Sequence, residues 1–269
     1  MSRPYPKYPN APVVELVLGV QFDPIPGFTS GHAGWFWKEH LGTSWKVSEA
    51  PPVPVQTEAF GQQGPQKLMF QLNQSPIVSR LMVQDVTGDR LLQVQNSRFH
   101  YNWQKADAEY PHYAPVYEDF IRHFTAFRAF VKDAAELAPI SLNQWEITYI
   151  DSIPPGELWQ TPDEWANVFP GLFPQKRELE GLSPETAGAQ RTFEIFPQKG
   201  RLHIAADLAY VGNNVAPSLM VRTTARGPLS QDVSDNALKS AFDMGHDVAG
   251  EAFDKLSSDT AKQFWRRTS

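Results

Sequence analysis

Hydrophobic and polar positions follow the same order twice along this chain. An apolar run over Val13–Phe22 ends in a Pro-rich turn, and a second run over Leu142–Ile153 ends in the same way. Their near-continuous apolar character predicts strands that are covered on both faces. A hydroxyl residue suited to the start of a helix follows each run, Ser30 in the first half and Thr161 in the second.

Turn residues divide the rest of the first half into strands and helices. The helix that begins at Ser30 is expected to stop at Gly42, and four strands follow it. A long helix is predicted from near Pro115 to about Leu137, because phenylalanines recur every three or four residues along this stretch. The predicted strands cover residues 53–60, 66–73, 78–85 and 90–95, and an aromatic-rich loop covers residues 99–113.

The second half repeats this order. Thr161 caps a short helix, extended stretches follow, and Ser234 or Asp235 begins a long helix. A last short helix is expected after Ser258. The extended stretches cover residues 177–182, 191–196, 202–210 and 219–224.

These patterns predict an α+β protein made of two tandem β-α-β4-α repeats. Residues 1–12 would form an extended, poorly packed lead-in, residues 13–137 the first repeat and residues 138–269 the second. Several strands alternate apolar and polar residues, so we expect a curved antiparallel sheet with the helices on one face. The element order resembles that of the TATA-binding-protein-like folds, and this resemblance concerns the order alone.

Three stretches of sequence resemble a sporadically distributed bacterial family of uncharacterised proteins. They are residues 12–22 (PVVELVLGVQF), residues 98–103 (RFHYNW) with Tyr110 and Pro111 following, and residues 146–151 (EITYID). The resemblance implies a bacterial cytoplasmic protein of about this length. It brings no established activity with it.

The composition narrows the class of protein. The absence of cysteine among the 269 residues excludes disulfides, zinc–thiolate sites and iron–sulfur clusters. The chain has neither a signal-peptide pattern nor an apolar window of about 18 residues, which predicts a soluble cytoplasmic protein with no membrane partner. A net charge of −6 with only 24 Lys and Arg residues makes nucleic acid an unlikely partner. No metal, nucleotide or serine-nucleophile motif is present, so no metal or cofactor is expected.

Two glutamates within the apolar runs are candidate catalytic residues. Glu15 and Glu146 are costly in such strands unless they are paired or face water. If the two first strands are neighbours, the carboxylates could share a proton, act as acid and base, or hold a divalent cation. The alternative is that each forms a structural ion pair or lies at a strand end. His246, within the long C-terminal helix, is interpreted as a core or surface residue.

The aromatic-rich loop combines groups that suit a planar or anionic ligand. A guanidinium would provide charge, an imidazole hydrogen bonding, and aromatic rings a stacking surface. The alternative is a strand-to-helix connection whose aromatic rings fill the core. The candidate ligand-binding residues are Arg98, His100, Tyr101, Asn102 and Trp103.

The sequence therefore favours a binding or interaction module for a protein partner or a small ligand at the junction of the repeats. An enzyme that uses Glu15, Glu146 and His100 is the alternative. Nucleic-acid binding through a saddle-shaped sheet is a third hypothesis, and it would need a contiguous basic face.

The loop hypothesis makes a direct prediction. Replacing Arg98 or Trp103 by alanine should abolish binding of the ligand or partner while the melting temperature barely moves. A large fall in melting temperature with binding intact would show that these residues are structural.

Overall fold

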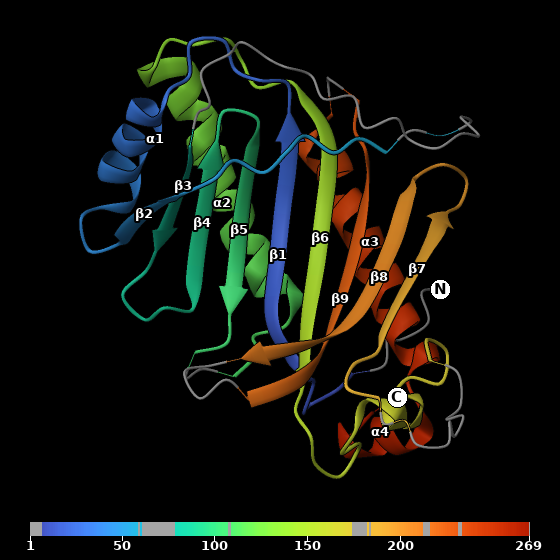
Figure 1. The fold of residues 1–269 in the computed structure, drawn as a ribbon. Helices are drawn as coiled ribbons and strands as arrows, with labels where there is room; N and C mark the ends of the chain where they lie inside the picture. The colour runs from blue at the N-terminus through green and yellow to red at the C-terminus, as the bar shows by residue number, and fades with distance from the viewer. Residues whose placement is uncertain are drawn as a thin grey trace.

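The computed structural model describes residues 7–58, 60, 79–106, 109–173, 182, 184–211, 216–230 and 233–268. In this part of the chain, nine strands form one antiparallel sheet in the order β2-β3-β4-β5-β1-β6-β9-β8-β7 (Figure 1). The strands are β1 (Val13–Phe22), β2 (Lys46–Ala50), β3 (Arg80–Gln84), β4 (Arg90–Gln95), β5 (Arg98–Gln104), β6 (Leu142–Ile153), β7 (Gly188–Ile195), β8 (Gly200–Val211) and β9 (Ala216–Pro228).

The main helices lie on one face of this sheet, as Figure 1 shows for α1, α2 and α3. The predicted α+β class, the antiparallel sheet and the placement of the helices are therefore confirmed. The helices are α1 (Ser30–Phe36), continued by the π-helical turn η1 (Trp37–Leu41), α2 (Tyr113–Ala129), continued by the π-helical turn η2 (Phe130–Ala134), the 3-10 helix η3 (Pro162–Asn167), α3 (Asp235–Leu256) and α4 (Asp259–Phe264).

Side-chain caps begin most of these helices where the sequence indicated. Thr161 forms a capping box with Glu164 at η3, and the Ser234 hydroxyl accepts from the backbone N–H of Ala237 at α3. Ser258 caps α4 in the same way. Ser30 is the first residue of α1, but the cap is Thr29. These contacts satisfy backbone N–H groups that the first helical turn leaves without a partner.

The strands β1 and β6 are antiparallel neighbours at the middle of the sheet. Leu18 lies opposite Ile147, and both side chains are fully buried on the helix-covered face. The register shifts between Val13 and Glu15, so that Val13 lies opposite Asp151. This β-bulge turns Val13 toward the helix-covered face, where an uninterrupted strand would turn it away.

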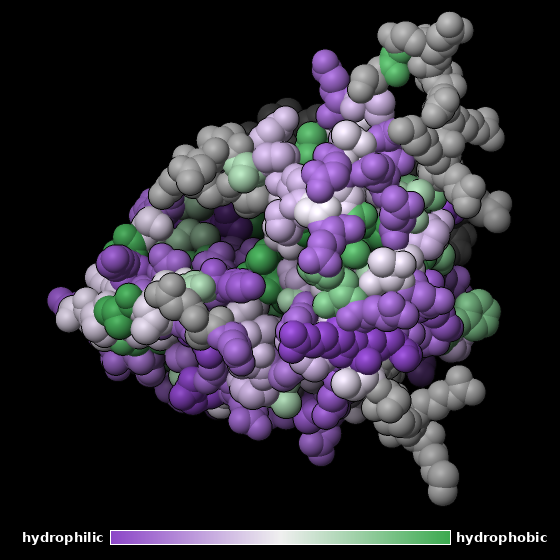
Figure 2. Space-filling view, turned by 90° about the horizontal axis from the view of Figure 1, so that it is seen from below, coloured by the Kyte–Doolittle hydropathy of each residue, from purple (hydrophilic) through white to green (hydrophobic). Residues whose placement is uncertain are grey.

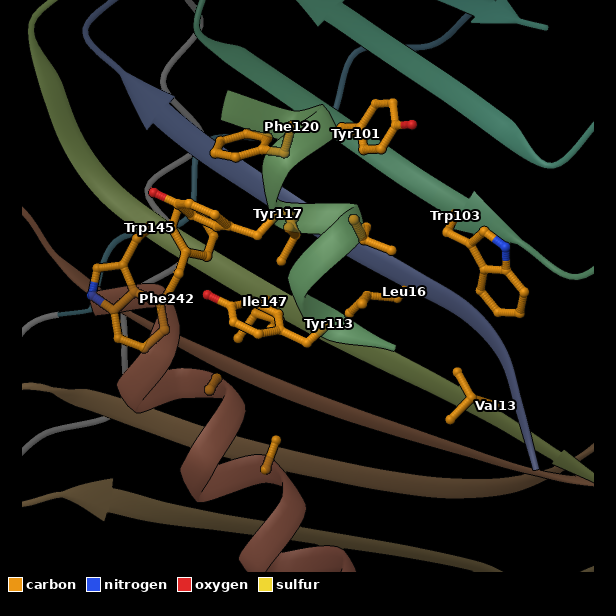
Figure 3. Close-up of a cluster of buried hydrophobic side chains, with 14 of the residues drawn as sticks. Val13, Leu16, Tyr101, Trp103, Tyr113, Tyr117, Phe120, Trp145, Ile147 and Phe242 are labelled. Atoms are coloured by element: carbon orange, nitrogen blue, oxygen red, sulfur yellow. The ribbon is translucent and has the colours of Figure 1, made fainter. Parts of the chain in front are cut away.

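Aromatic side chains fill the space between the sheet and the helices (Figure 3). Phe120 of α2 and Phe242 of α3 have ring centroids 5.1 Å apart, and Trp145 of β6 packs on Phe242 at 6.3 Å. Phe120, Phe124 and Phe127 form the apolar stripe on α2 that the sequence predicted. The end of the molecule seen in Figure 2 is largely hydrophilic, with hydrophobic residues grouped near the middle of the view.

One predicted strand of the first half is wrong. Residues 51–58 and 60 are not a strand; residues 51–58, which we call the strap, cross the other face of the sheet from β4 toward β9 (Figure 1). Val53 pairs with a side chain of β4 rather than with a neighbouring strand. The predicted strand over residues 66–73 lies outside the described residues, as does most of the stretch over 177–182.

The predicted aromatic loop is also wrong over its first part. Residues 98–104 form β5, which pairs with both β4 and β1, and only residues near 105–112 connect it to α2. The poor packing expected of the N-terminal lead-in does not hold for Tyr8. That side chain is buried against Phe253 and Trp265.

The close approach of α3 to β6 makes Gly245 sensitive to substitution. A Cβ atom there would lie 2.5 Å from a ring carbon of Trp145 and 2.7 Å from Ile147. We expect Gly245→Ala to lower the free energy of unfolding by about 1–3 kcal/mol, the usual cost of overpacking. Gly34→Ala in α1, where no atom lies within 4 Å of the added Cβ, should instead stabilise by up to about 1 kcal/mol. Urea unfolding of the two variants measures both effects, and an equal response at the two positions would contradict the packing.

Candidate functional site

The alternation of strand β5 divides the predicted ligand-binding residues between two faces of the sheet. Arg98, His100 and Asn102 point to the face crossed by the strap, which we call the polar face. Tyr101 and Trp103 point to the helix-covered face, where both are buried. The five residues therefore cannot form one contact surface.

The polar face holds the strap through its glutamine side chains. Gln95 binds both the N–H and the carbonyl of Val53, and the Gln21 side chain accepts from the N–H of Gln56 at 3.0 Å. Arg98 donates to the Gln21 side chain at 2.7 Å and to the carbonyl of Pro54 at 2.9 Å. These side chains satisfy backbone groups that a crossing segment cannot pair with a neighbouring strand.

His100 lies two residues along β5 from Arg98 on the same face, directly over Gly19 of β1. A Cβ atom at Gly19 would lie 2.3 Å from the imidazole, so the ring needs the glycine beside it. Glu146 lies opposite Gly19 from the other side, which places His100 and Glu146 in one row across three strands. Burial, and then the charges of Arg98 and Arg80, lower the pKa of His100 to about 3. The ring is neutral at physiological pH.

Glu15 does not join this row. It lies opposite Ile150, four residues from Glu146 along β6, which separates the two carboxylates by about 13 Å along the strand direction. Its carboxylate accepts from Asn102 at 2.5 Å and from the Gln104 amide at 3.1 Å. The pairing thus brings His100 toward Glu146 but leaves Glu15 too far away to share a proton with Glu146.

The burial of Arg98 and Trp103 also changes what their removal should do. Arg98 is 3% exposed and Trp103 is fully buried. Truncation of a buried tryptophan costs about 3–5 kcal/mol. Contrary to the expectation from the sequence, we therefore expect alanine at either position to lower the melting temperature.

A cavity of about 390 Å³ lies on the helix-covered side, next to the pairing of β1 with β6. Its walls come from the lead-in, the connection before α2, the helix α3 and the strands β6 and β9. Most of the lining is apolar or aromatic, with Lys7 among the lining residues and exposed to solvent. Aromatic residues of this lining are Tyr8, Tyr110, Tyr113, Tyr149 and Phe253.

Asp151 contributes a buried carboxyl to the lining of this cavity. It is 2% exposed and lines the cavity, and its side chain has no hydrogen bond or ion pair within the described part of the chain. Burial raises the pKa of its carboxyl to about 7. The β-bulge beside it places Val13 of β1 on the same face, so the cavity begins where the lead-in enters the sheet.

A hydrogen-bonded pair lies beside Asp151. The hydroxyl of Tyr149 is 2.6 Å from Nδ1 of His246, and burial lowers the pKa of His246 to about 4, which leaves the ring neutral. The imidazole stacks on Tyr113 with centroids 4.4 Å apart. The Tyr113 hydroxyl donates to Asp243 at 2.9 Å. Asp151, the Tyr149–His246 pair and Tyr113 therefore line the same mainly apolar cavity.

The sequence alone did not predict that these side chains line one cavity. His246 was interpreted as a core or surface residue, and in the fold it is bonded to Tyr149 in the cavity wall. The signal for Asp151 was its place two residues after Tyr149 on an apolar strand, since residues two apart share a face.

Other site classes find no support in the described residues. Within them, no three His, Asp or Glu side chains are grouped so as to hold a metal ion. No helix among them is both long and apolar enough to span a membrane. Comparison of the chain with protein families, curated proteins and solved structures found no match. The proposal for function therefore rests on the cavity.

The buried carboxyl predicts a particular dependence of stability on pH. The folded pKa of Asp151, about 7, is above its ordinary value of 3.8, so the folded state holds a proton that the unfolded state loses. Its contribution is fully present below pH 4 and disappears as the pH rises through 7. We expect Asp151→Asn to match the wild type at pH 4 and to exceed it by up to about 4 kcal/mol at pH 8. Urea unfolding across this range tests it, and a difference independent of pH would contradict the burial of the carboxyl.

Proposed function

We propose that the protein binds a small organic cation, an amine with an apolar or aromatic body, in the Asp151 cavity. The observation that carries this proposal is a buried carboxyl that lines the cavity and has no partner in the described residues. A volume of about 390 Å³ is in the range of small-molecule sites rather than protein interfaces. Of the two partners that the sequence favoured, the small ligand is therefore the better supported.

The chemistry of the lining selects the charge of the ligand. A carboxylate withdrawn from water is costly unless a cation or hydrogen-bond donor compensates it. An ammonium group beside Asp151 would provide that compensation and would favour the ionised carboxylate. The faces of Tyr8, Tyr110 and Phe253 supply apolar contact and can attract a cation. Lys7 disfavours a second positive group near its ammonium.

We also infer that the two halves are diverged tandem repeats of the β-α-β4-α type. The first and last strands of each half pair with each other, β1 with β5 and β6 with β9, and the two first strands meet at the centre. Each half also has a capping box after its first strand, at Thr29 and at Thr161. In the described residues, the second half has three strands between its helices where the first has four. The proposed ligand would lie at the junction of these halves.

Proton transfer to or from the ligand is a second candidate function. A carboxyl with a pKa of about 7 can act as a general base near neutral pH, and the Tyr149–His246 pair lies in the same cavity. This alternative places the chemistry at Asp151 rather than at Glu15, Glu146 and His100. Nucleic-acid binding across the sheet finds less support, because the strap crosses the polar face near the end of β1 and covers part of it.

Phenethylamine and 2-phenylethanol test the proposed ligand class, because they share a shape and differ in charge. We expect the amine to bind the wild type at pH 8 at least tenfold more tightly than the alcohol, as measured by calorimetry. Asp151→Asn should reduce amine binding at least tenfold and leave alcohol binding unchanged. Near pH 7, amine binding should also release protons, because ion pairing lowers the pKa of Asp151.

The controls separate a lost charge from a lost fold. The Asp151→Asn side chain keeps the volume of the original, and the pH series described above reports its stability. The matched control is Glu15→Gln, which removes a carboxylate from the polar face. This variant should bind the amine as the wild type does. Equal binding of the amine by wild type and Asp151→Asn would refute the proposal.

A further inference from the structure

The polar face carries a second charged cluster, centred on the carboxylate of Glu58 in the strap. Arg201 and His203 of β8 and Arg226 of β9 all contact this carboxylate. The Glu58 side chain is only 4% exposed. Burial opposes its ionisation, but hydrogen bonds from His203, Arg226 and Arg201 outweigh burial and hold the pKa of Glu58 at about 2. The Glu58 carboxylate is thus an anion held by cationic and hydrogen-bonding groups. We call the site formed by Arg201, His203 and Arg226 the Glu58 seat.

A polar cavity of about 290 Å³ adjoins this seat on the same face. His203 belongs to both, because its Nε2 lies 2.7 Å from Glu58 and its Nδ1 lies 3.3 Å from the Thr192 hydroxyl. The other polar lining residues are Gln190, Arg191, Arg222 and Thr224. A molecule in this cavity would therefore lie beside the Glu58 carboxylate and reach the same imidazole.

Arg222 contributes a guanidinium group to the lining of the cavity. Within the described residues it makes no hydrogen bond and no ion pair, whereas Arg226, four positions along β9, is bound to Glu58. Arg222 lies between Ala205 of β8 and Ile150 of β6, and its side chain is exposed to solvent. A guanidinium in this position can bind a carboxylate or phosphate through two parallel hydrogen bonds.

We propose that the Glu58 seat and the adjoining cavity form a binding site for a small hydrophilic anion, a carboxylate or a phosphate. In the free chain, Glu58 occupies the seat as an internal ligand. An external anion enters at Arg222 and competes with Glu58 for Arg201, His203 and Arg226. This site is independent of the Asp151 cavity, which lies on the other face of the sheet and suits a cation.

Competition at this seat would loosen the strap. The strap is held by amide side chains at Val53, Gln56 and Glu58, by Arg98 at the carbonyl of Pro54, and by the Glu58 carboxylate at its end. Neutral hydrogen bonds are individually weaker than those to charged groups, so displacement of the carboxylate removes the strongest attachment. A bound anion would therefore increase the exposure of the strap.

Phosphate and acetate, each compared with chloride at the same ionic strength, test the site in the full chain. We expect Glu58→Gln to bind phosphate at least tenfold more tightly than the wild type, because the internal competitor is neutralised. Adding Arg222→Ala to this variant should reverse the gain. Glu15→Gln, which neutralises a carboxylate held by amides on the same face, should behave as the wild type. The acetate arm distinguishes a site for any carboxylate from one that requires a phosphate.

Hydrogen exchange of the wild type gives a second measurement that needs no variant. The backbone amides of Val53, Gln56 and Glu58 should exchange faster in phosphate than in chloride, while the amides of β1 should not change. Either of two results would overturn the proposal: a folded Glu58→Gln protein that binds neither anion more tightly than the wild type, or strap amides whose exchange is the same in phosphate and chloride.

Discussion

The antiparallel pairing of β1 with β6 is the contact on which the rest of the structure depends. It joins the strands contributed by the two halves into one sheet and fixes which residues of both strands face the helices. Because side chains alternate along a strand, this one register places Ile147 in the aromatic core and Glu146 on the polar face. A slip of one residue would exchange the two faces and bury the wrong set of side chains.

The two faces solve the same problem of burial by different means. The helix-covered face packs aromatic rings against α2 and α3, and its cavity contains few polar groups. The polar face instead buries amides and charges under the strap, where Gln21, Gln95 and Arg98 are bound to strap backbone atoms. Neither arrangement gives every buried polar atom a partner: within the described residues, Nε2 of His100 on the polar face and Nε1 of Trp103 on the helix-covered face have none. Asp151 differs from these atoms because its carboxyl lines a cavity large enough for a small molecule, and this is why the cavity is the stronger candidate site.

The sequence predicted much of the fold because its signals there are local. The strands Val13–Phe22 and Leu142–Ile153 are continuous apolar runs, and the predicted caps at Thr161, Ser234 and Ser258 need only nearby residues. Strand β5 was misinterpreted because its polar members resemble a binding loop, although they alternate strictly with aromatic residues. The candidate site could not be predicted in the same way, since it joins Asp151 to residues from α3 and the lead-in. Such long-range contacts leave no periodic trace in the chain.

The bulge between Val13 and Glu15 decides the path of the chain's beginning. Without the additional residue, Val13 would point to the polar face, and residues 7–12 would enter over that side of the sheet. With it, they enter on the side of α3, where Tyr8 meets Phe253 and closes one wall of the cavity. The one additional residue thus places residues 7–12 on the helix-covered face and leaves the polar face to the strap.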